Sequence, residues 1–293
     1  MQPEAANDTR SLEAGLDALQ TDSVIGHRSL RDRLAWSILP PIAAVALFVL
    51  LWQAVVWSGV RPSYTLAGPQ DVWVAMGALF SDGTATKAVL TSVERGVLGF
   101  VIAVLIATPV GIVVARVRIV RASIGPLITG LQVLPSIAWV PAAILWFGIS
   151  DGTVYFVILL GAVPSIINGL VSGVDQVPPL YRRVGTVLGA GRWQMVRYVI
   201  LPAAMPGYVA GLRQGWAFSW RSLMAAELIV NSPNLGVGLG SLLDQGRLLN
   251  EMTLVVAGIL GILVVGIAVE LCLFAPLEKS VLRRRGLLVG KEG

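Results

Sequence analysis

Four polar side chains inside one long apolar segment, residues 202–230, are the groups best placed to do chemistry. They are Arg213, Gln214, Arg221 and Glu227. A charged group inside a membrane costs about 3 kcal/mol or more unless it faces protein or water. Arg221 and Glu227 are six positions apart, which is about 600° of helical rotation, so they do not share one helix face. These groups therefore either pair with neighbouring helices or a partner subunit, or line a water-filled path.

Histidine and cysteine offer little chemistry in this chain. His27 is the only histidine and Cys272 the only cysteine, which excludes a disulfide within the chain and a Cys/His zinc site. His27 lies in the polar N-terminal segment, so we expect a solvated side chain rather than a member of a Ser-His-Asp triad. An enzyme acting within the membrane would therefore lack its nucleophile or its metal cluster.

The lysines do not form a phosphate-binding motif. A P-loop needs a Gly-x-x-x-x-Gly-Lys-Ser/Thr run, and neither Lys87, Lys279 nor Lys291 lies in that context. We expect that the chain has no ATPase site and binds no cofactor. Any ATP hydrolysis linked to it would then take place on a separate subunit.

Composition determines the elements that must position these residues. Of the 293 residues, 55% are hydrophobic and 13% are charged, which is too apolar for a soluble domain. The apolar residues form runs of about 18 to 25, the length at which a helix crosses a bilayer. We predict an all-α integral membrane protein with six transmembrane helices, over residues 35–57, 92–115, 124–149, 154–173, 202–230 and 252–275.

Prolines and glycines mark the irregular parts. The third span contains Pro126, Pro135 and Pro141, so we expect a kinked or discontinuous helix there. The polar segment 58–91 is interpreted as external, with one interfacial helix in its middle. A Gly-rich external loop is expected over 231–250.

The basic side chains predict the orientation. The formal net charge of +5 comes from residues that flank apolar runs, so it indicates topology rather than binding of nucleic acid. We therefore expect a multi-pass protein of a bacterial cytoplasmic membrane, surrounded by lipid, with both termini in the cytoplasm. Its parts are a tail 1–34, a membrane domain 35–278 with a cytoplasmic loop 174–201, and a basic tail 279–293. The outer segments hold only Arg61, Lys87 and Arg247. The inner segments hold Arg28, Arg31, Arg33, Arg116, Arg118, Arg121, Arg182, Arg183, Arg192, Arg197, Lys279, Arg283, Arg284, Arg285 and Lys291.

The cytoplasmic loop carries the most specific pattern. Pro179 and Gly189 bracket a short helix of basic and apolar residues, and Gly189 permits a sharp break. Residues 192–199 would form a second short helix that leads into the membrane. Two short helices at an angle on a cytoplasmic surface are typical of a docking site for another protein.

This loop resembles the "EAA" loop of binding-protein-dependent ABC importers. The family pattern is Glu-Ala-Ala, three residues, Gly, nine residues and Ile-x-Leu-Pro. Gly189, Leu201 and Pro202 match it, Val199 replaces the Ile, and residues 183–185 depart from Glu-Ala-Ala. The resemblance implies a coupling helix over 180–191 that inserts into an ATPase subunit. A Glu-mediated contact cannot be made at residue 183. The loop residues assigned to coupling are Leu180, Arg182, Arg183, Gly185, Leu188, Gly189, Arg192, Leu201 and Pro202.

Further segments are similar to the nitrate, sulfonate and taurine branch of these permeases. They are residues 134–141, 144–149, Trp220-Arg221 with Ala226-Glu227, and 234–238, within a resemblance covering about 92–285. The resemblance implies two ATPase subunits inside, a second permease copy, and an extracytoplasmic substrate-binding protein. It also implies alternating access for a small anionic solute such as an aliphatic sulfonate, taurine or nitrate, although similar permeases serve neutral compounds. The candidates for the translocation path are Pro135, Trp139, Arg213, Gln214, Arg221 and Glu227.

A secondary transporter is the alternative for such a chain. Secondary transporters also contain broken helices and charges within the membrane, but they usually carry an internal repeat. We find no convincing repeat in this sequence. Co-purification of an ATPase would favour the importer, and proton-driven uptake without one would favour the secondary transporter.

Overall fold

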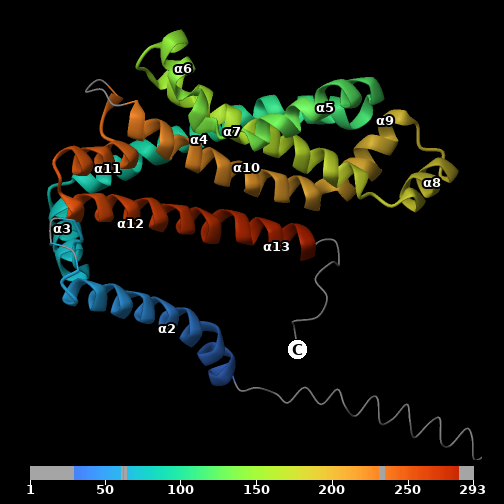
Figure 1. The fold of residues 1–293 in the computed structure, drawn as a ribbon. Helices are drawn as coiled ribbons and strands as arrows, with labels where there is room; N and C mark the ends of the chain where they lie inside the picture. The colour runs from blue at the N-terminus through green and yellow to red at the C-terminus, as the bar shows by residue number, and fades with distance from the viewer. Residues whose placement is uncertain (1–29, 61, 63–64, 231–234, 284–293) are drawn as a thin grey trace, which may run out of the picture. The chain divides into compact units, whose positions relative to one another are not determined.

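The computed structural model describes residues 30–60, 62, 65–230 and 235–283, with side chains from residue 39 onward. All regular structure in these ranges is helical (Figure 1). The chain divides into two compact units, Met1–Val60 and Arg61–Gly293, and each is described by itself. The expected tail 1–34 lies largely outside the described residues, as does most of the basic tail 279–293.

The first unit contains one long helix, α2 (Leu30–Trp57). Its segment Leu39–Trp57 is long and apolar enough to cross a membrane. The predicted span starts at residue 35, where the apolar run starts, but the helix begins at Leu30. Polar residues can extend a helix beyond its apolar run, so the span prediction did not locate the helix start. Pro40 and Pro41 consequently lie inside the helix rather than in its first turn.

The second unit is built from long helices joined by short ones. They are α3 (Pro69–Ser81), α4 (Thr84–Arg116), α5 (Arg118–Val133), η1 (Ser136–Trp139), α6 (Val140–Phe147), α7 (Asp151–Asp175), α8 (Pro179–Val187), α9 (Arg192–Gln194), η2 (Met195–Ile200), α10 (Leu201–Ile229), α11 (Leu239–Leu248), α12 (Met252–Val269), η4 (Glu270–Phe274) and α13 (Ala275–Arg283).

Five helical segments of the described chain could each cross a membrane by length and composition, and a sixth arises if a bent pair counts as one span. The bent pair is 118–133 with 136–147, and its two parts meet at 96°. Pro135 lies at the break, and Leu134 before it is extended (φ −73°, ψ 125°), as the residue before a proline prefers. The predicted discontinuity of the third span is therefore confirmed.

The segment 58–91, which the sequence predicts to be external, contains the expected short helix, α3, followed by a tight turn into α4. Gly83 takes a left-handed conformation (φ 78°) in this turn. The backbone N–H of Thr84 donates to Asp82 Oδ1 at 2.8 Å, and this bond lowers the pKa of the Asp82 carboxyl below its ordinary value. Helix α4 begins at Thr84 rather than at residue 92, so the long helix starts well before the predicted span.

Two prolines lie where helices continue without a break. Helix α10 follows α9 through η2, a π-helical turn that ends just before Pro202. Helix α13 likewise follows α12 through the π-helical turn η4, and Pro276 comes just after it. A proline ring collides with the carbonyl four residues earlier, and a π turn widens the helix at that point. The fifth and sixth predicted spans are therefore parts of longer helices, 192–229 and 252–283.

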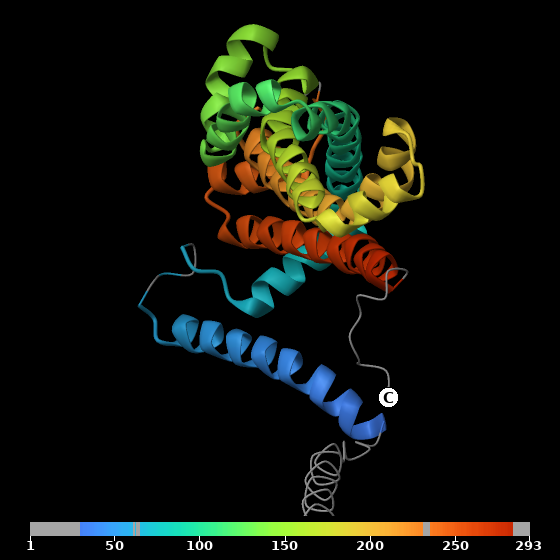
Figure 2. The ribbon, with the colours of Figure 1, turned by 90° about the vertical axis from the view of Figure 1, so that its right-hand side faces the viewer.

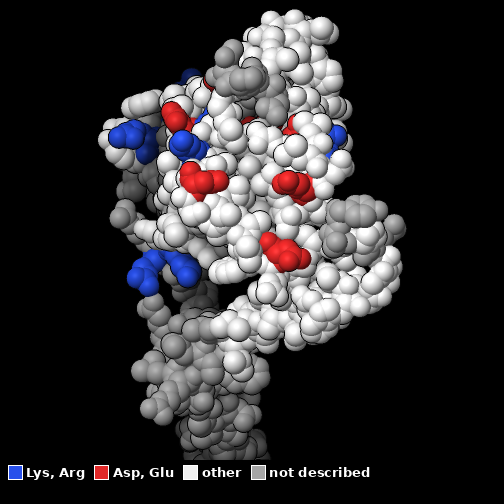
Figure 3. All heavy atoms as spheres, turned by 90° about the vertical axis from the view of Figure 1, so that its left-hand side faces the viewer, with Lys and Arg blue, Asp and Glu red and all other residues white. Residues whose placement is uncertain are grey.

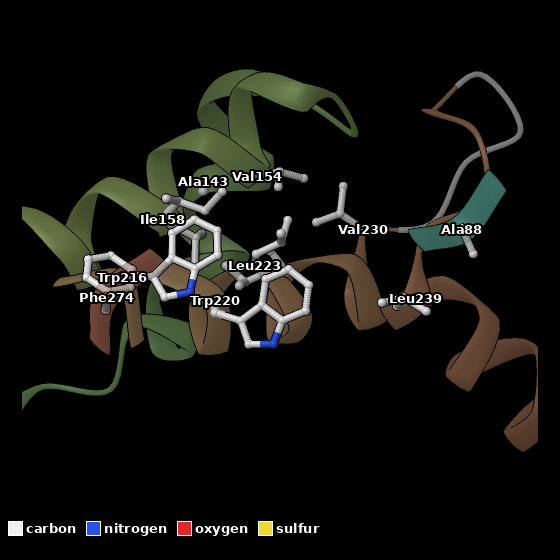
Figure 4. Packing of buried hydrophobic residues seen from close by; sticks show 13 residues of the cluster. Ala88, Ala143, Val154, Ile158, Trp216, Trp220, Leu223, Val230, Leu239 and Phe274 are labelled. Carbon is white, nitrogen blue, oxygen red and sulfur yellow. The ribbon is translucent and has the colours of Figure 1, made fainter. Parts of the chain in front are cut away.

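The core of the second unit forms where α7 packs against α4 and α10. Ile158 of α7 and Leu223 of α10 are fully buried. Trp216 and Trp220 stack with ring centroids 6.0 Å apart, and they pack in the same cluster (Figure 4). Burial of such apolar side chains holds the three helices together.

Glycines let the backbones of α7 and α10 approach closely. A Cβ added at Gly169 would collide with the Cα of Gly211, and one at Gly173 would lie 2.6 Å from the carbonyl oxygen of Ala204. On α4, a Cβ at Gly99 would lie 2.8 Å from Ile158. Small residues at helix contacts are typical of membrane bundles.

Candidate functional site

Helices α8 and α9 form a bend, here called the elbow (residues 179–194), that projects from the second unit (Figure 2). Gly189 takes a left-handed conformation (φ 75°) directly after α8. The N–H of Ala190 donates to Gly185 O at 3.0 Å, which closes the helix end as a Schellman motif does. The predicted short helix between Pro179 and Gly189, and the break at Gly189, are confirmed.

Gly185 explains how the elbow rests on the helix that follows it. It is the buried residue of α8, and a Cβ there would lie 2.7 Å from Met195 Cε of η2. Met195 yields only by shifting its flexible side chain, so the position favours a small residue. Gly185 occupies an Ala position of the family pattern, which also calls for a small side chain.

The remaining elbow surface is basic and apolar. Leu188 is 79% exposed and Val187 is 86% exposed, at the tip of the bend. The side chains of Arg182, Arg183 and Arg192 are exposed beside them, and residues 174–201 contain no glutamate and only Asp175 as an acid. Leu180 is also exposed, whereas Leu201 and Pro202 are half-buried at the start of α10. Exposed apolar side chains beside unpaired charges are typical of an interaction surface.

At the other end of the second unit, Arg95 and Glu227 form a buried ion pair, 3.3 Å between Nη1 and Oε1. Arg95 is 8% exposed and Glu227 is 2% exposed. Arg95 also pairs with Asp151 at 2.9 Å and donates to the carbonyl oxygen of Leu235. Three helices and the segment after α10 therefore meet at one guanidinium.

Glu227 in turn accepts hydrogen bonds from two other elements. Ser92 Oγ donates to Glu227 Oε2 at 2.7 Å, and the N–H of Gly240 donates to the same oxygen at 3.0 Å. The N–H of Leu239 donates to Ser92 Oγ at 2.8 Å. These bonds satisfy amides in the first turn of α11, where a negative charge is also favoured by the helix dipole. We call the group Ser92, Arg95, Asp151 and Glu227 the outer clasp, because the sequence predicts that this end of the second unit faces outward.

The outer clasp corrects the prediction for the segment 231–250 and adds Arg95 to the candidate site residues. The segment 231–250 is not simply a loop, because α11 forms within it, with its first turn bonded to Glu227 and Ser92. Arg95 was not among the predicted site residues. Arg95 lies on the buried face of α4 together with Ser92 and Gly99. The small residues three and four positions away predict a face packed against other helices, and an arginine on such a face needs a partner. On the end shown in Figure 3, acidic and basic side chains interrupt an otherwise uncharged surface.

Arg213 of α10 pairs with two carboxylates that do not belong to the outer clasp. Its guanidinium lies 2.5 Å from Glu270 Oε1 and 2.8 Å from Glu278 Oε2, on η4 and α13. The expectation that Arg213, Arg221 and Glu227 meet different neighbours is confirmed.

A groove lined mainly by α5, α7 and α10, and also by η1 and α13, brings together several predicted path residues. Its larger part, about 570 Å³, is lined by Gln132, Asn168, Ser172 and Gln214 among others. A second part, about 350 Å³, shares Gln132 and is lined by Pro135, Ser136, Phe218, Arg221 and Ser222. Neither lining includes Trp139, Arg213 or Glu227.

The polar lining of the groove is mostly uncharged, apart from Glu278 in the larger part and Arg221 in the smaller part. Asn168 Nδ2 donates to Gln132 Oε1 at 2.7 Å, and Gln132 Nε2 donates to Ser165 Oγ at 3.1 Å. The hydroxyls of Ser136 and Ser222 lie 2.7 Å apart. Arg221 adds a positive charge, with its guanidinium carbon 5.1 Å from the centre of the Phe218 ring.

Comparisons with known proteins identify relatives of this chain among permease proteins. The taurine transport system permease protein TauC of Escherichia coli is 33% identical over 211 residues, 72% of each chain. The nitrate import permease protein NrtB of Synechocystis sp. is 28% identical over 238 residues, 77% of this chain and 85% of the relative.

A solved structure shows the fold. A chain of the MetNI methionine ABC transporter, in inward-facing conformations, superposes with a TM-score of 0.51 at 17% identity, covering 67% of this chain and 95% of that one. The model of the binding-protein-dependent transport system inner membrane component family matches residues 107–275. The chain therefore belongs to this family, the membrane-spanning permeases of ABC importers.

Proposed function

We propose that this permease imports a small anionic solute, of the aliphatic sulfonate, taurine or nitrate type, by alternating access. ATP is bound and hydrolysed by two partner ATPase subunits, and this chain binds no cofactor. A second permease copy completes the pathway, and a binding protein delivers the solute from outside. Both chain termini lie in the cytoplasm, and lipid surrounds the spans.

The elbow is the observation that carries the proposal, as the surface on which the ATPase docks. Leu180, Val187 and Leu188 are exposed at its tip, and burying one such side chain contributes about 1.5 to 3 kcal/mol. Arg182 and Arg183 would face acidic groups or carbonyl oxygens of the partner. Arg183 stands where the family pattern has Glu, so the partner's contacting group there is an acceptor rather than a donor.

The continuous helical segment that joins the elbow to the groove supports coupling of ATP hydrolysis to transport. Helix 192–229 runs without a break from the elbow to the groove wall that carries Gln214 and Arg221. A shift of the elbow when the ATPase pair closes would therefore move one wall of the groove. Hinge and shear motions of packed helices are a standard means of such switching.

The test is a pair of matched leucine substitutions at the two ends of the molecule. Leu188→Glu puts a charge on the elbow, and Leu248→Glu puts one on α11, where the leucine is 65% exposed. We expect Leu188→Glu to lower the recovery of the co-expressed ATPase subunit at least about tenfold, since about 1.4 kcal/mol corresponds to a factor of ten. Leu248→Glu should leave this recovery unchanged. Equal recovery of the ATPase with both variants, each inserted normally in membranes, would refute docking at the elbow.

A further inference from the structure

The charges of the arginines inside the spans are compensated unequally. The buried guanidinium of Arg95 meets Asp151 and Glu227, and that of Arg213 meets Glu270 and Glu278. Arg221 also lies within a span, but no ion pair joins it to a carboxylate of the described residues. A charge in a membrane segment is costly, so one without a countercharge points to a functional site.

The surroundings of Arg221 hold it at the groove. Its guanidinium lies over the Phe218 ring at 5.1 Å from the ring centre, a distance at which a cation is attracted to the aromatic face. Both residues line the smaller part of the groove. The side chain is exposed there, whereas the neighbouring Ser222 is buried.

Two hydroxyls line the same part of the groove as Arg221. They belong to Ser136 and Ser222, and their oxygens lie 2.7 Å apart. Because one of the two protons suffices for this mutual bond, the other hydroxyl can donate to a ligand. The amide of Gln132 lines the same space.

We propose that Arg221, Ser136 and Ser222 form a transient anion site that selects the transported solute by its oxyanion group. This inference rests on the proposed function and names the residue that enforces its charge preference. A guanidinium presents a planar fork that matches the oxygens of a sulfonate, nitrate or carboxylate. A single cation with neutral hydroxyls holds an anion weakly, as a pathway requires for release.

The test measures the electrostatic potential at the site directly. In a Cys272→Ser background, Ala225→Cys places a thiol on the groove lining. The permease is studied in membranes with its co-expressed ATPase. We measure the rate at which the introduced thiol reacts with a negatively charged methanethiosulfonate and with a positively charged one. The labelling ratio is the first rate divided by the second. We expect Arg221→Gln to lower this ratio at least about fivefold, because a unit charge nearby acts oppositely on the two reagents. Arg221→Lys should retain most of the ratio.

Two further measurements complete the test. Arg118→Gln removes an exposed charge outside the groove lining and should leave the ratio unchanged. Sodium nitrate and taurine should slow labelling of Ala225→Cys when Arg221 is present and not when it is Gln. If Ala225→Cys does not react, Ile137→Cys, which lines the same part of the groove from η1, reports on the charge instead.

An unchanged ratio in Arg221→Gln, or labelling that neither anion slows, would overturn the anion site. The labelling ratio does not depend on whether the ATPase docks at the elbow. Unchanged ATPase recovery in the Leu188→Glu test would count against the proposed function alone, so the two proposals fail separately.

Discussion

At the scale of single residues, the carboxylate of Glu227 is shared between α4 and the first turn of α11. Its oxygens accept from Ser92 and Gly240 and pair with Arg95, all in buried surroundings. We predict that Glu227→Gln destabilises the protein by about 3 kcal/mol, because Arg95 loses one partner while it stays buried. Thermal unfolding in detergent checks this, with Glu251→Gln as the control on an exposed carboxylate.

A double substitution separates pairing from other effects. Arg95→Gln should cost much less in the Glu227→Gln background than alone, because residues in one ion-pair network couple. Additive losses for the two changes would mean that the outer clasp does not act as a unit.

Sequence alone predicted which of these charged residues lie on different helix faces, but it did not predict which of them form ion pairs. Helical periodicity correctly placed Arg221 and Glu227 on different faces. It gave no indication that Arg95, 132 positions earlier, would meet Glu227, because that contact depends on how α4 and α10 pack. The same limit left Arg213 and Arg221 equivalent as candidates for the translocation path until the carboxylates of Glu270 and Glu278 were placed.

At the scale of elements, the contact between α7 and α10 depends on paired glycines. We predict that Gly169→Ala destabilises the protein by about 2 kcal/mol or more, because its Cβ would collide with the backbone of Gly211, which cannot move aside cheaply. Gly130→Ala in α5 is the matched control, since a Cβ there meets nothing within 4 Å.

The control should be neutral or stabilising by up to about 1 kcal/mol, because alanine favours a helix over glycine. The yield of monodisperse protein and its unfolding temperature report both effects. If Gly169→Ala matched Gly130→Ala in both readouts, the helices would not be in close backbone contact.

Hydropathy predicted that these helices exist better than it predicted their ends. The apolar runs located α4, α7, α10 and α12, and the prolines located the break at Pro135. The start of α4 was missed because polar residues such as Thr84 extend a helix without lengthening its apolar run. One group that caps α11, Glu227, lies on another helix, and the local cap, Gly238 with Ser241, is a weak signal in a Gly-rich segment.

At the scale of the whole second unit, the elbow and the outer clasp lie at opposite ends of the long helices (Figure 1). Helix 192–229 reaches from one to the other, since it begins beside the elbow and carries Glu227 of the clasp. This continuity gives a mechanical reason why an event at the ATPase could reach the outer side. The family pattern predicted the elbow from sequence, while the groove could be identified only once three helices had been placed.

The most direct test of the central claim is site-specific photo-crosslinking of the assembled importer in membranes. A photoreactive residue at Val187, which is 86% exposed on the elbow, should capture the ATPase subunit. The same residue at Leu248, on α11, should not capture it. Capture of the ATPase from residue 248, or its absence from residue 187 in a complex that retains ATPase activity, would contradict the account.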